Sequence, residues 1–200
     1  MELGSCLDCR FGEKAFCARF PEPTRKKICE YSRPFKLPAG KDFFIGDLVN
    51  EIVFIYSGVS FAGMDKAGLY HIVRPGHVAN IVHLLPDKRV GFSKSWNAEH
   101  WGFAASDVHG CAVPIAVCNL LVESDPGFAQ MMLTKTLEQY SRALETMVFM
   151  SSHSSEEKMR WFRDAIEPLG VKIGDLTHER IGKLLGINRV TVTRLLAKLD

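Results

Sequence analysis

The 200-residue sequence predicts an α+β fold that combines an antiparallel β-roll, one long helix and a helix-turn-helix. Three observations lead to this prediction. Glycine and proline interrupt short runs of β-forming residues across residues 31–124, a pattern typical of antiparallel sheets. A stretch with helical periodicity follows at 125–152. Within residues 153–200, two short amphipathic segments are joined by a glycine, as in a helical pair with a tight turn.

Composition and charge limit the class of protein. The chain is long enough for one substantial core or two modest ones, and 46% of its residues are hydrophobic, an ordinary value for a globular protein. The net charge of +2 is too small to indicate nucleic acid by itself. No apolar run approaches the roughly 18 residues of a membrane-spanning helix, and a secretion-signal pattern is absent. We therefore expect a cytoplasmic protein with no membrane contact, in which thiols stay reduced.

Residues 1–30 form a cysteine-bearing arm in which two prolines prevent one long helix. Two residues separate Cys6 from Cys9, seven residues separate Cys9 from Cys17, and Cys111 lies at the end of a predicted strand. Four thiolates can hold zinc or an iron–sulfur cluster. The spacing does not distinguish these two sites, although the lack of a second Cys-x-x-Cys pair disfavours zinc.

The β-roll is expected within residues 31–124. Its predicted strands, each short and rich in β-forming residues, span 42–45, 51–56, 59–62, 69–74, 78–85, 101–105 and 108–113. Glycine and proline recur every several residues between them. The two remaining cysteines, Cys29 and Cys118, have apolar neighbours and are expected to be buried thiols.

The 125–152 segment is expected to be a dimerisation helix. Asp125 and Pro126 supply an N-cap and a first-turn proline. Apolar residues alternate at spacings of four and three, as in the seam of a two-stranded coiled coil, which predicts a homodimer. The seam residues are Leu133, Leu137, Tyr140, Leu144 and Met147. The alternative is a helix packed only on its own sheet, for which Met132, Val148 and Phe149 supply further apolar surface.

Local signals define two short helices within residues 153–200, after another helix expected at 156–169. Thr177 is expected to cap the first helix, and Gly186 to end it because glycine adopts a left-handed backbone without steric cost. Asn188 is expected to cap the second. Five basic side chains against two acidic ones in residues 176–200 fit a phosphate-facing surface. The basic residues are Arg180, Lys183, Arg189, Arg194 and Lys198.

The second of these helices presents groups suited to the major groove of DNA. Guanidinium and ammonium groups bind phosphates and guanine, and hydroxyls and a small apolar group complete the surface. The expected DNA-contacting residues are Thr177, Arg189, Val190, Thr191, Thr193, Arg194 and Lys198. The sequence therefore predicts a gene regulator that binds double-stranded DNA. The alternative is an ordinary helical hairpin in a dimer module that does not bind DNA.

Four segments together resemble one protein family over essentially the whole chain. They are Cys6-Leu-Asp-Cys9 with Cys17, the stretch from Leu37-Pro-Ala-Gly40 to Tyr56-Ser-Gly58, His109-Gly-Cys111-Ala-Val-Pro114, and the stretch from Ile181-Gly182 to Leu195-Leu196. In this order the segments resemble the Crp/Fnr transcription regulators, specifically the oxygen-sensing Fnr branch. The resemblance implies a cyclic-nucleotide-binding-like, cupin-like β-roll as the sensor domain. It also implies a homodimer on a palindromic promoter site, with RNA polymerase as a further partner.

The resemblance also implies a metal site. In Fnr-like sensors, three arm cysteines and one cysteine just before an Ile/Val-Pro step bind a [4Fe-4S] cluster that responds to oxygen. By position, the ligands in this sequence are Cys6, Cys9, Cys17 and Cys111. The arm would then pack beside the start of the long helix. Loss of the cluster would loosen the dimer seam and abolish DNA binding.

Two departures from the family pattern concern the DNA-binding segment. Fnr-like proteins carry a glutamate where this sequence has Val190, and valine offers only a methyl surface to thymine. We therefore expect an A·T pair where the Fnr-type half-site TTGAT has its G·C pair. The family pattern also continues into a β-hairpin wing, and because the sequence stops at Asp200 we expect a truncated winged helix.

Other effectors and functions remain as alternatives. The same scaffold would sense a small molecule, or the thiol redox state through a disulfide between Cys6 and Cys9, without a cluster. The Gly-Glu and Arg-Ser/Thr pattern that holds cyclic nucleotides in this family is absent from the sequence. Haem is disfavoured because a lone histidine is more often structural than a ligand. A cupin-like metalloenzyme is the least favoured, since the sequence lacks an H-x-H pair with a suitably spaced glutamate and histidine, and we expect no enzymatic activity.

Overall fold

The computed structural model describes residues 16–44, 50–65, 68–84 and 100–198. It confirms the predicted α+β fold of antiparallel sheets, a long helix and a helix-turn-helix. The helices are η3 (Phe16–Arg19), α1 (Glu22–Tyr31), η5 (Ile81–Leu84), α3 (Ile115–Ser124), α4 (Pro126–Ser152), α5 (Ser155–Ile166), η6 (Glu167–Leu169), η7 (Ile173–Asp175), α6 (His178–Leu185) and α7 (Arg189–Leu196). Among the described residues, no helix is both long and apolar enough to cross a bilayer.

Two antiparallel sheets form the β-roll. The first sheet has the strand order β1 (Arg33–Leu37), β8 (Val108–Pro114), β3 (Glu51–Ser57) and β6 (Val78–Ala79). The second sheet has the order β2 (Asp42–Phe44), β7 (His100–Ala104), β4 (Ser60–Met64) and β5 (Gly68–Val73). On β3, Val53 and Ile55 pack between the sheets, while Ile52 and Phe54 face the other way, as the two-residue period of a strand requires.

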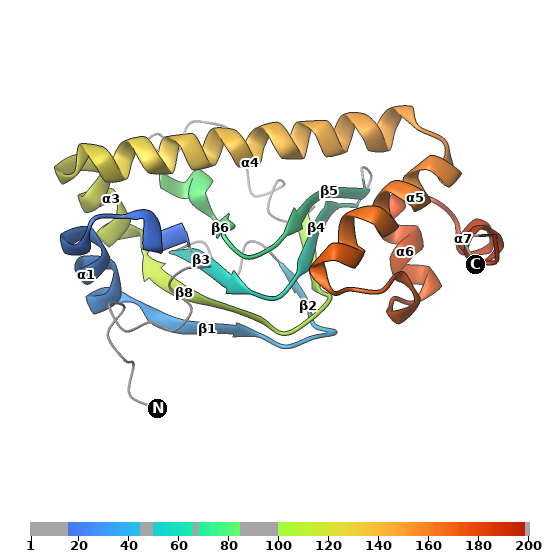
Figure 1. The fold of residues 1–200 in the computed structure, drawn as a ribbon, viewed down its shortest axis with the longest axis horizontal. Helices are drawn as coiled ribbons and strands as arrows, with labels where there is room; N and C mark the ends of the chain where they lie inside the picture. Colours follow the sequence, from blue (N-terminus) through green and yellow to red (C-terminus); the bar gives the residue numbers. More distant parts are fainter. Residues whose placement is uncertain (1–15, 45–49, 66–67, 85–99, 199–200) are drawn as a thin grey trace.

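The helices cover the roll on three sides (Figure 1). The long helix α4 runs along one side of both sheets, with α1 and α3 at one end of the roll and α5, α6 and α7 at the other. Asp125 caps α4, since its carboxylate accepts a hydrogen bond from the Phe128 amide at 3.1 Å. Ser154 and Glu157 form a capping box at the start of α5. The capping box explains why a new helix begins directly after the end of α4 at Ser152.

Several elements differ from the sequence prediction, and one of them is β1, which was not predicted. The strand expected at 78–85 is only β6, because Asn80 adopts a left-handed backbone with φ 63°, which ends the strand before η5. The short helix α1 was not predicted in the arm, and it begins at the two prolines, since Pro23 lies in its first turn, where no amide partner is needed. The helix α3 was not predicted.

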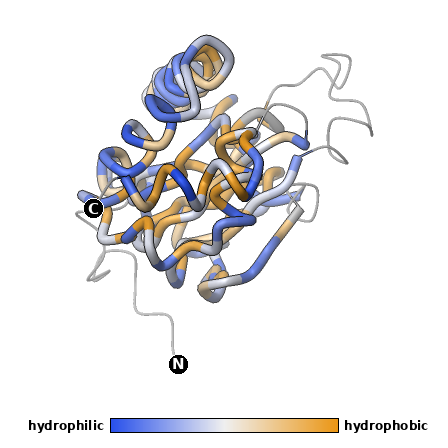
Figure 2. The backbone as a smooth tube through the Cα atoms, turned by 90° about the vertical axis from the view of Figure 1, so that its right-hand side faces the viewer, coloured by the Kyte–Doolittle hydropathy of each residue, from blue (hydrophilic) through white to orange (hydrophobic). Residues whose placement is uncertain are grey.

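Two apolar clusters attach the helices to the roll. The N-terminal cluster lies under η3, α1 and α3 and contains Phe16, Cys17, Phe20, Ile28, Ile52, Phe54, Val78, Ile81, Val113, Cys118, Leu121, Phe128 and Met132. The junction cluster joins the second sheet to α5, α6 and α7 and contains Val59, Phe61, Leu69, Trp101, Phe103, Met150, Met159, Phe162, Ile166, Val171, Leu176, Ile181, Leu184, Leu185, Val192 and Leu195. In Figure 2 the hydrophobic segments gather in the interior, whereas α4, seen end-on, carries both kinds of residue.

Candidate functional site

The helix-turn-helix is built by the local signals in its sequence. The Thr177 hydroxyl accepts a hydrogen bond from the Arg180 amide at 3.2 Å, which caps α6. Gly186 ends α6 with φ 65°, and the Asn188 side chain caps α7 by accepting from the Thr191 amide at 2.8 Å. The inner faces of both helices are buried in the junction cluster. The two helices are therefore held at a fixed angle, as in a helix-turn-helix unit.

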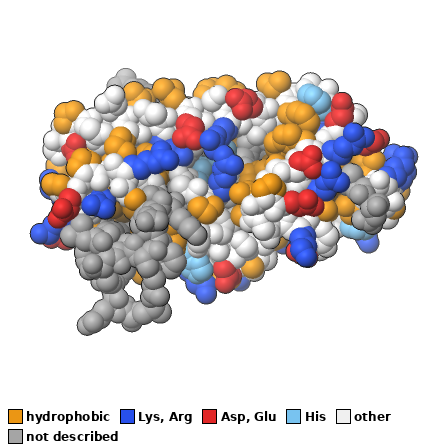
Figure 3. Space-filling model, viewed as in Figure 1, with side chains coloured by type: hydrophobic (Ala, Val, Ile, Leu, Met, Phe, Trp, Pro, Cys, Tyr) orange, Lys and Arg blue, Asp and Glu red, His pale blue; other side chains and the backbone are white. Residues whose placement is uncertain are grey.

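The outer face of α7 is exposed. Of the seven residues predicted to contact DNA, all except Thr191, which is partly buried, are exposed. Val190 is 78% exposed, so its methyl groups are accessible from solvent. His178 was not predicted, yet its Nδ1 atom lies 2.8 Å from the Thr193 hydroxyl, which fixes the orientation of that hydroxyl. Basic side chains, with acidic ones among them, gather at this end of the molecule (Figure 3).

Two basic residues of α6 contact the roll. The Arg180 guanidinium donates to both carboxylate oxygens of Asp42, at 2.6 and 3.1 Å, and lies 3.7 Å from the ring centroid of Phe103. The Lys183 ammonium lies 4.3 Å from the Trp101 ring centroid. Arg180 and Lys183 therefore contribute to the contact between α6 and the roll. Their role depends on tertiary contacts that the local sequence does not specify.

Gly68 brings the roll close to α6. It has φ +73°, and a Cβ atom at this position would lie 2.8 Å from the carbonyl oxygen of Leu184. Only glycine combines this backbone with so close an approach. The hydrogen bond and charge of Arg180 also lower the pKa of the Asp42 carboxyl, so this carboxylate stays ionised in the contact. The helix-turn-helix is thus attached by apolar packing with an ionic border.

The predicted seam residues form an exposed apolar stripe along α4. Leu133, Leu137, Tyr140, Leu144 and Met147 are 60%, 59%, 62%, 44% and 38% exposed. The face of α4 that packs on the roll uses other residues, namely Phe128, Met132, Lys135, Thr146 and Met150. Packing on its own sheet therefore leaves the stripe uncovered in the single chain. A contiguous exposed apolar surface of this kind is typical of a protein interface.

Two of the four predicted cluster ligands lie in the described residues, whereas Cys6 and Cys9 lie outside them. Cys17 is buried in η3. Cys111 is partly exposed on β8, directly opposite Phe54 of β3, so both side chains share one face of the first sheet. The Phe54 ring lies 6.4 Å from that of Phe20, close to Cys17 in the chain. Both thiols therefore belong to the end of the roll covered by η3 and α1.

The other two cysteines differ from each other. Cys118 is fully buried on α3, as predicted, and burial raises the pKa of its thiol to about 12. It is therefore a poor source of thiolate. Cys29 was expected to be buried and is partly exposed instead. The reason is helical geometry: α1 turns Thr24 and Ile28, four positions apart, into the core, and the next residue points about 100° away.

Comparison with known proteins identifies the fold. No protein-family model and no curated protein matches the sequence. Among solved structures, a protein from Eubacterium rectale described as a transcriptional regulator of the Crp/Fnr family has a TM-score of 0.69 at 14% identity, covering 90% of this chain and 84% of that one. The c-di-GMP-responsive global regulator CLP of Xanthomonas campestris has a TM-score of 0.64 at 14% identity, covering 90% and 91%. FixK2 of Bradyrhizobium japonicum has a TM-score of 0.62 at 16% identity, covering 84% of each chain. The chain therefore has the fold of these regulators.

Proposed function

We propose that this chain is a DNA-binding transcription regulator of the Crp/Fnr type that acts as a homodimer. The observation that carries the proposal is the exposed outer face of α7, on which Arg189, Val190 and Arg194 stand clear of the rest of the molecule. The regulators with the same fold support it. Arginine side chains bind guanine and phosphate, and Val190 offers a methyl surface for thymine.

The α4 stripe supplies the dimer contact in this proposal. Two chains joined along it would present two α7 helices, and a symmetric pair of this kind reads a palindrome whose half-sites lie about one DNA turn apart. Leu137→Glu is expected to give a monomer in sedimentation analysis, because it places a charge in the seam. The matched control is Leu120→Glu on α3, where the leucine is 60% exposed but outside the stripe. Equal dissociation of both variants would contradict the assignment.

DNA binding is tested by fluorescence anisotropy with palindromic duplexes chosen by selection from random sequence. The selected half-site is expected to carry an A·T pair where TTGAT has G·C, and unchanged TTGAT would refute the role given to Val190. Arg194→Ala is expected to weaken binding about ten- to hundredfold. Arg160→Ala is the control, since Arg160 lies on the exposed side of α5 and pairs with Glu156. Absence of salt-dependent binding to any duplex would contradict the function itself.

We propose further that Cys6, Cys9, Cys17 and Cys111 hold a [4Fe-4S] cluster. The two described thiols support such a site, because both lie at the end of the first sheet that η3 and α1 cover. When bound, the cluster would supply a redox centre that reacts with oxygen. The arm also has a direct contact with α4: the Phe20 ring lies 4.9 Å from that of Phe128, and the Lys135 ammonium lies 5.5 Å from the Phe16 ring. A change in the arm therefore reaches the dimer helix through packed side chains.

Anaerobic purification with iron and sulfide analysis tests the cluster. About four irons per chain are expected, and Cys111→Ser is expected to lose them. Cys118→Ser is the control, because this buried thiol lies outside the proposed ligand set. Iron-free protein after anaerobic reconstitution would overturn the cluster. A disulfide between Cys6 and Cys9 in that protein would favour a thiol sensor on the same scaffold.

A further inference from the structure

Thr193, on the outer face of α7, has two hydrogen-bond partners within the protein. The His178 Nδ1 atom, at the start of α6, lies 2.8 Å from the Thr193 hydroxyl oxygen. The same hydroxyl donates to the main-chain carbonyl of Arg189, one turn earlier in α7, at 3.1 Å. Thr193 is exposed, and His178 is partly buried beside it. The hydroxyl is therefore engaged by two protein groups and still accessible to a third group from outside.

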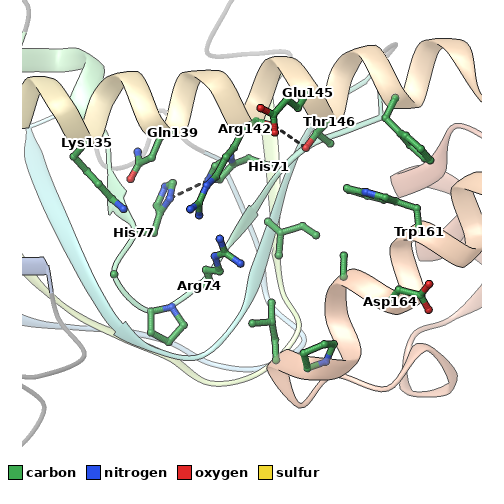
Figure 4. A pocket seen from close by; sticks show the side chains of 17 residues that line it. His71, Arg74, His77, Lys135, Gln139, Arg142, Glu145, Thr146, Trp161 and Asp164 are labelled. Carbon is green, nitrogen blue, oxygen red and sulfur yellow. Dashed lines mark hydrogen bonds between the residues drawn. The ribbon is translucent and has the colours of Figure 1, made fainter.

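Histidines of the roll make contacts of a different kind. The His71 Nε2 and His77 Nδ1 atoms lie 3.0 Å apart, and both residues line the cavity between β5 and α4 (Figure 4). The His109 Nδ1 atom lies 3.1 Å from the Ser57 hydroxyl on the first sheet. These contacts join parts of the roll to one another. The contact of His178 instead reaches the side of α7 that the proposed function assigns to DNA, so it bears on what that side presents to a base.

The two contacts of the Thr193 hydroxyl determine where its single hydrogen lies. A hydroxyl has one hydrogen to donate and two lone pairs that accept. If the hydrogen points to the Arg189 carbonyl, the His178 ring donates its own hydrogen from Nδ1, and both contacts are hydrogen bonds. If the hydrogen points to Nδ1 instead, the two oxygen atoms of the other contact face each other with no hydrogen between them. The first arrangement satisfies both contacts, and it leaves one lone pair of the hydroxyl for a partner outside the protein.

Packing, and not this hydrogen bond, holds α6 and α7 together. The inner faces of both helices are buried in the junction cluster. At the turn between them, a Cβ atom on Gly182 would lie 2.7 Å from the Ile187 carbonyl oxygen, so the two backbone segments are already in close contact. A single hydrogen bond to an exposed hydroxyl adds little to such packing. The effect of His178 on the orientation of the Thr193 hydroxyl is therefore the larger consequence of their contact.

The orientation of this hydroxyl decides which bases it matches. A threonine on a recognition helix is ambiguous by itself, because its hydroxyl either donates or accepts a hydrogen bond. In the major groove adenine N6 and cytosine N4 are donors, whereas guanine O6 and thymine O4 are acceptors. A hydroxyl whose hydrogen is used by the Arg189 carbonyl, and which already accepts from His178, can only accept from a base. It therefore matches the amino group of adenine or cytosine and leaves the oxygen of guanine or thymine without a donor.

We propose that His178 is a positioning residue that makes Thr193 select a base with an amino group in the major groove, adenine or cytosine. The inference rests on the proposed DNA-binding function and deepens it, because it adds a specificity determinant to Val190 and Arg194. Those two side chains offer a methyl surface and a guanidinium. Thr193 adds a position at which the donor or acceptor character of the base decides. His178 acts there through Thr193 and does not itself contact the base.

Selection of palindromic duplexes from random sequence, followed by fluorescence anisotropy, tests this role in DNA reading. Thr193→Val keeps the shape of the side chain and removes the hydroxyl, so the base position whose preference it abolishes is the one that Thr193 reads. At that position the parent protein is expected to prefer adenine or cytosine over guanine or thymine by about three- to tenfold, the worth of one hydrogen bond. His178→Gln is expected to reduce this preference to about twofold or less, because its amide nitrogen corresponds to Nε2 and not to Nδ1. Preferences at the other positions are expected to stay as in the parent.

His178→Asn is the matched variant that should restore the preference. The asparagine amide nitrogen occupies the same place along the side chain as Nδ1, so it donates to the Thr193 hydroxyl without an imidazole ring. A role limited to ring packing would not predict this rescue. His153→Asn is the control, because His153 is exposed at the end of α4, outside the helix-turn-helix, and it is expected to leave every base preference unchanged. Circular dichroism and denaturant titration check that all variants are folded.

Nitrogen NMR of the intact protein without DNA tests the hydrogen-bond arrangement directly. The Nδ1 atom of His178 is expected to carry a hydrogen, because only then do both contacts of the Thr193 hydroxyl form. The signal is assigned from its absence in His178→Asn, and Thr193→Val is expected to shift it. A ring whose only hydrogen lies on Nε2 would overturn the proposal whether or not the protein binds DNA.

Three results of the DNA experiments would also overturn the proposal. They are unchanged base preferences in Thr193→Val, a preference for guanine or thymine at the position that Thr193 reads, and equal preferences of the His178→Gln and His178→Asn proteins. Each of these results is obtained with protein that binds DNA, so the proposed function stands when one of them occurs. Absence of binding to every duplex contradicts the proposed function instead. The two failures are therefore distinguishable.

Discussion

The two ends of the β-roll are covered in different ways. At the N-terminal cluster the covering helices are attached by aromatic packing, in which Phe20 contacts both Phe54 and Phe128. At the junction cluster an apolar centre has an ionic border, where Arg180 and Lys183 meet the roll. Surface ion pairs weaken with salt and with acid, whereas aromatic packing is far less sensitive to either. The attachment at the junction cluster is therefore the more sensitive of the two to salt and acid.

The largest expected loss of stability comes from removing one buried ring from the N-terminal cluster. Phe128→Ala removes a fully buried ring that contacts Phe20, and it is expected to lower the free energy of unfolding by about 3–5 kcal/mol. Denaturant titration measures this loss, which should be nearly the same at low and moderate salt. Leu120→Ala is the control, since this leucine is exposed. Equal losses for the two variants would show that the cluster does not secure this end.

The contrast between the ends also explains which parts the sequence predicts. The caps Thr177 and Asn188 and the turn glycine Gly186 act through atoms within a few residues, so local sequence is sufficient to place α6 and α7. Strand β1 was not predicted, and its Pro34 is tolerated because β1 is an edge strand, where a missing amide costs no hydrogen bond within the sheet. The contact of Arg180 with Asp42 joins residues 138 positions apart, and no local pattern predicts it.

Within α4, too, some features follow from the local sequence and others depend on contacts with distant residues. Its exposed stripe was predicted from spacing alone, because a repeat of four and three depends only on helical geometry. The burial of Lys135 on the opposite face was not predicted. It depends on Glu138 and on the ring of Phe16, which the fold brings to that face from another part of the chain.

A smaller loss of stability is expected when a side chain is added where the roll approaches α6. Gly68→Ala must accommodate φ +73° and a Cβ atom 2.8 Å from the Leu184 carbonyl, and it is expected to cost about 1–3 kcal/mol. Gly40→Ala is a matched control, because Gly40 has φ +79° and open space around its Cβ position. Gly68→Ala should therefore lose more stability and should loosen α6 in hydrogen exchange. Equal effects of the two variants would show that the close approach to α6 does not matter.

The ionic border alone is expected to have a still smaller effect. Asp42→Asn removes the charge that pairs with Arg180, and because the pair is partly exposed the cost is about 1 kcal/mol or less. Hydrogen exchange of the α6 amides should rise, while that of β3 should not. Glu51→Gln is the control, since Glu51 pairs with Arg33 on the first sheet, away from the junction. The difference between Asp42→Asn and the parent should shrink near 1 M salt, where screening acts within about 3 Å.

The smallest expected effect is the pH dependence of the stability that the Asp42–Arg180 ion pair contributes. The hydrogen bond from Arg180 lowers the pKa of Asp42, so the folded protein binds this proton less readily than the unfolded chain, whose aspartates titrate near about 3.9. The stabilisation is therefore fully present above about pH 5, and it is lost as the pH falls through the lowered pKa. The stability gap between the parent and Asp42→Asn should stay constant from about pH 7 to 5 and narrow below about pH 4. Denaturant titrations at each pH measure the gap. A gap that narrows between pH 7 and 5 would place the responsible group elsewhere, since no aspartate with a lowered pKa titrates there.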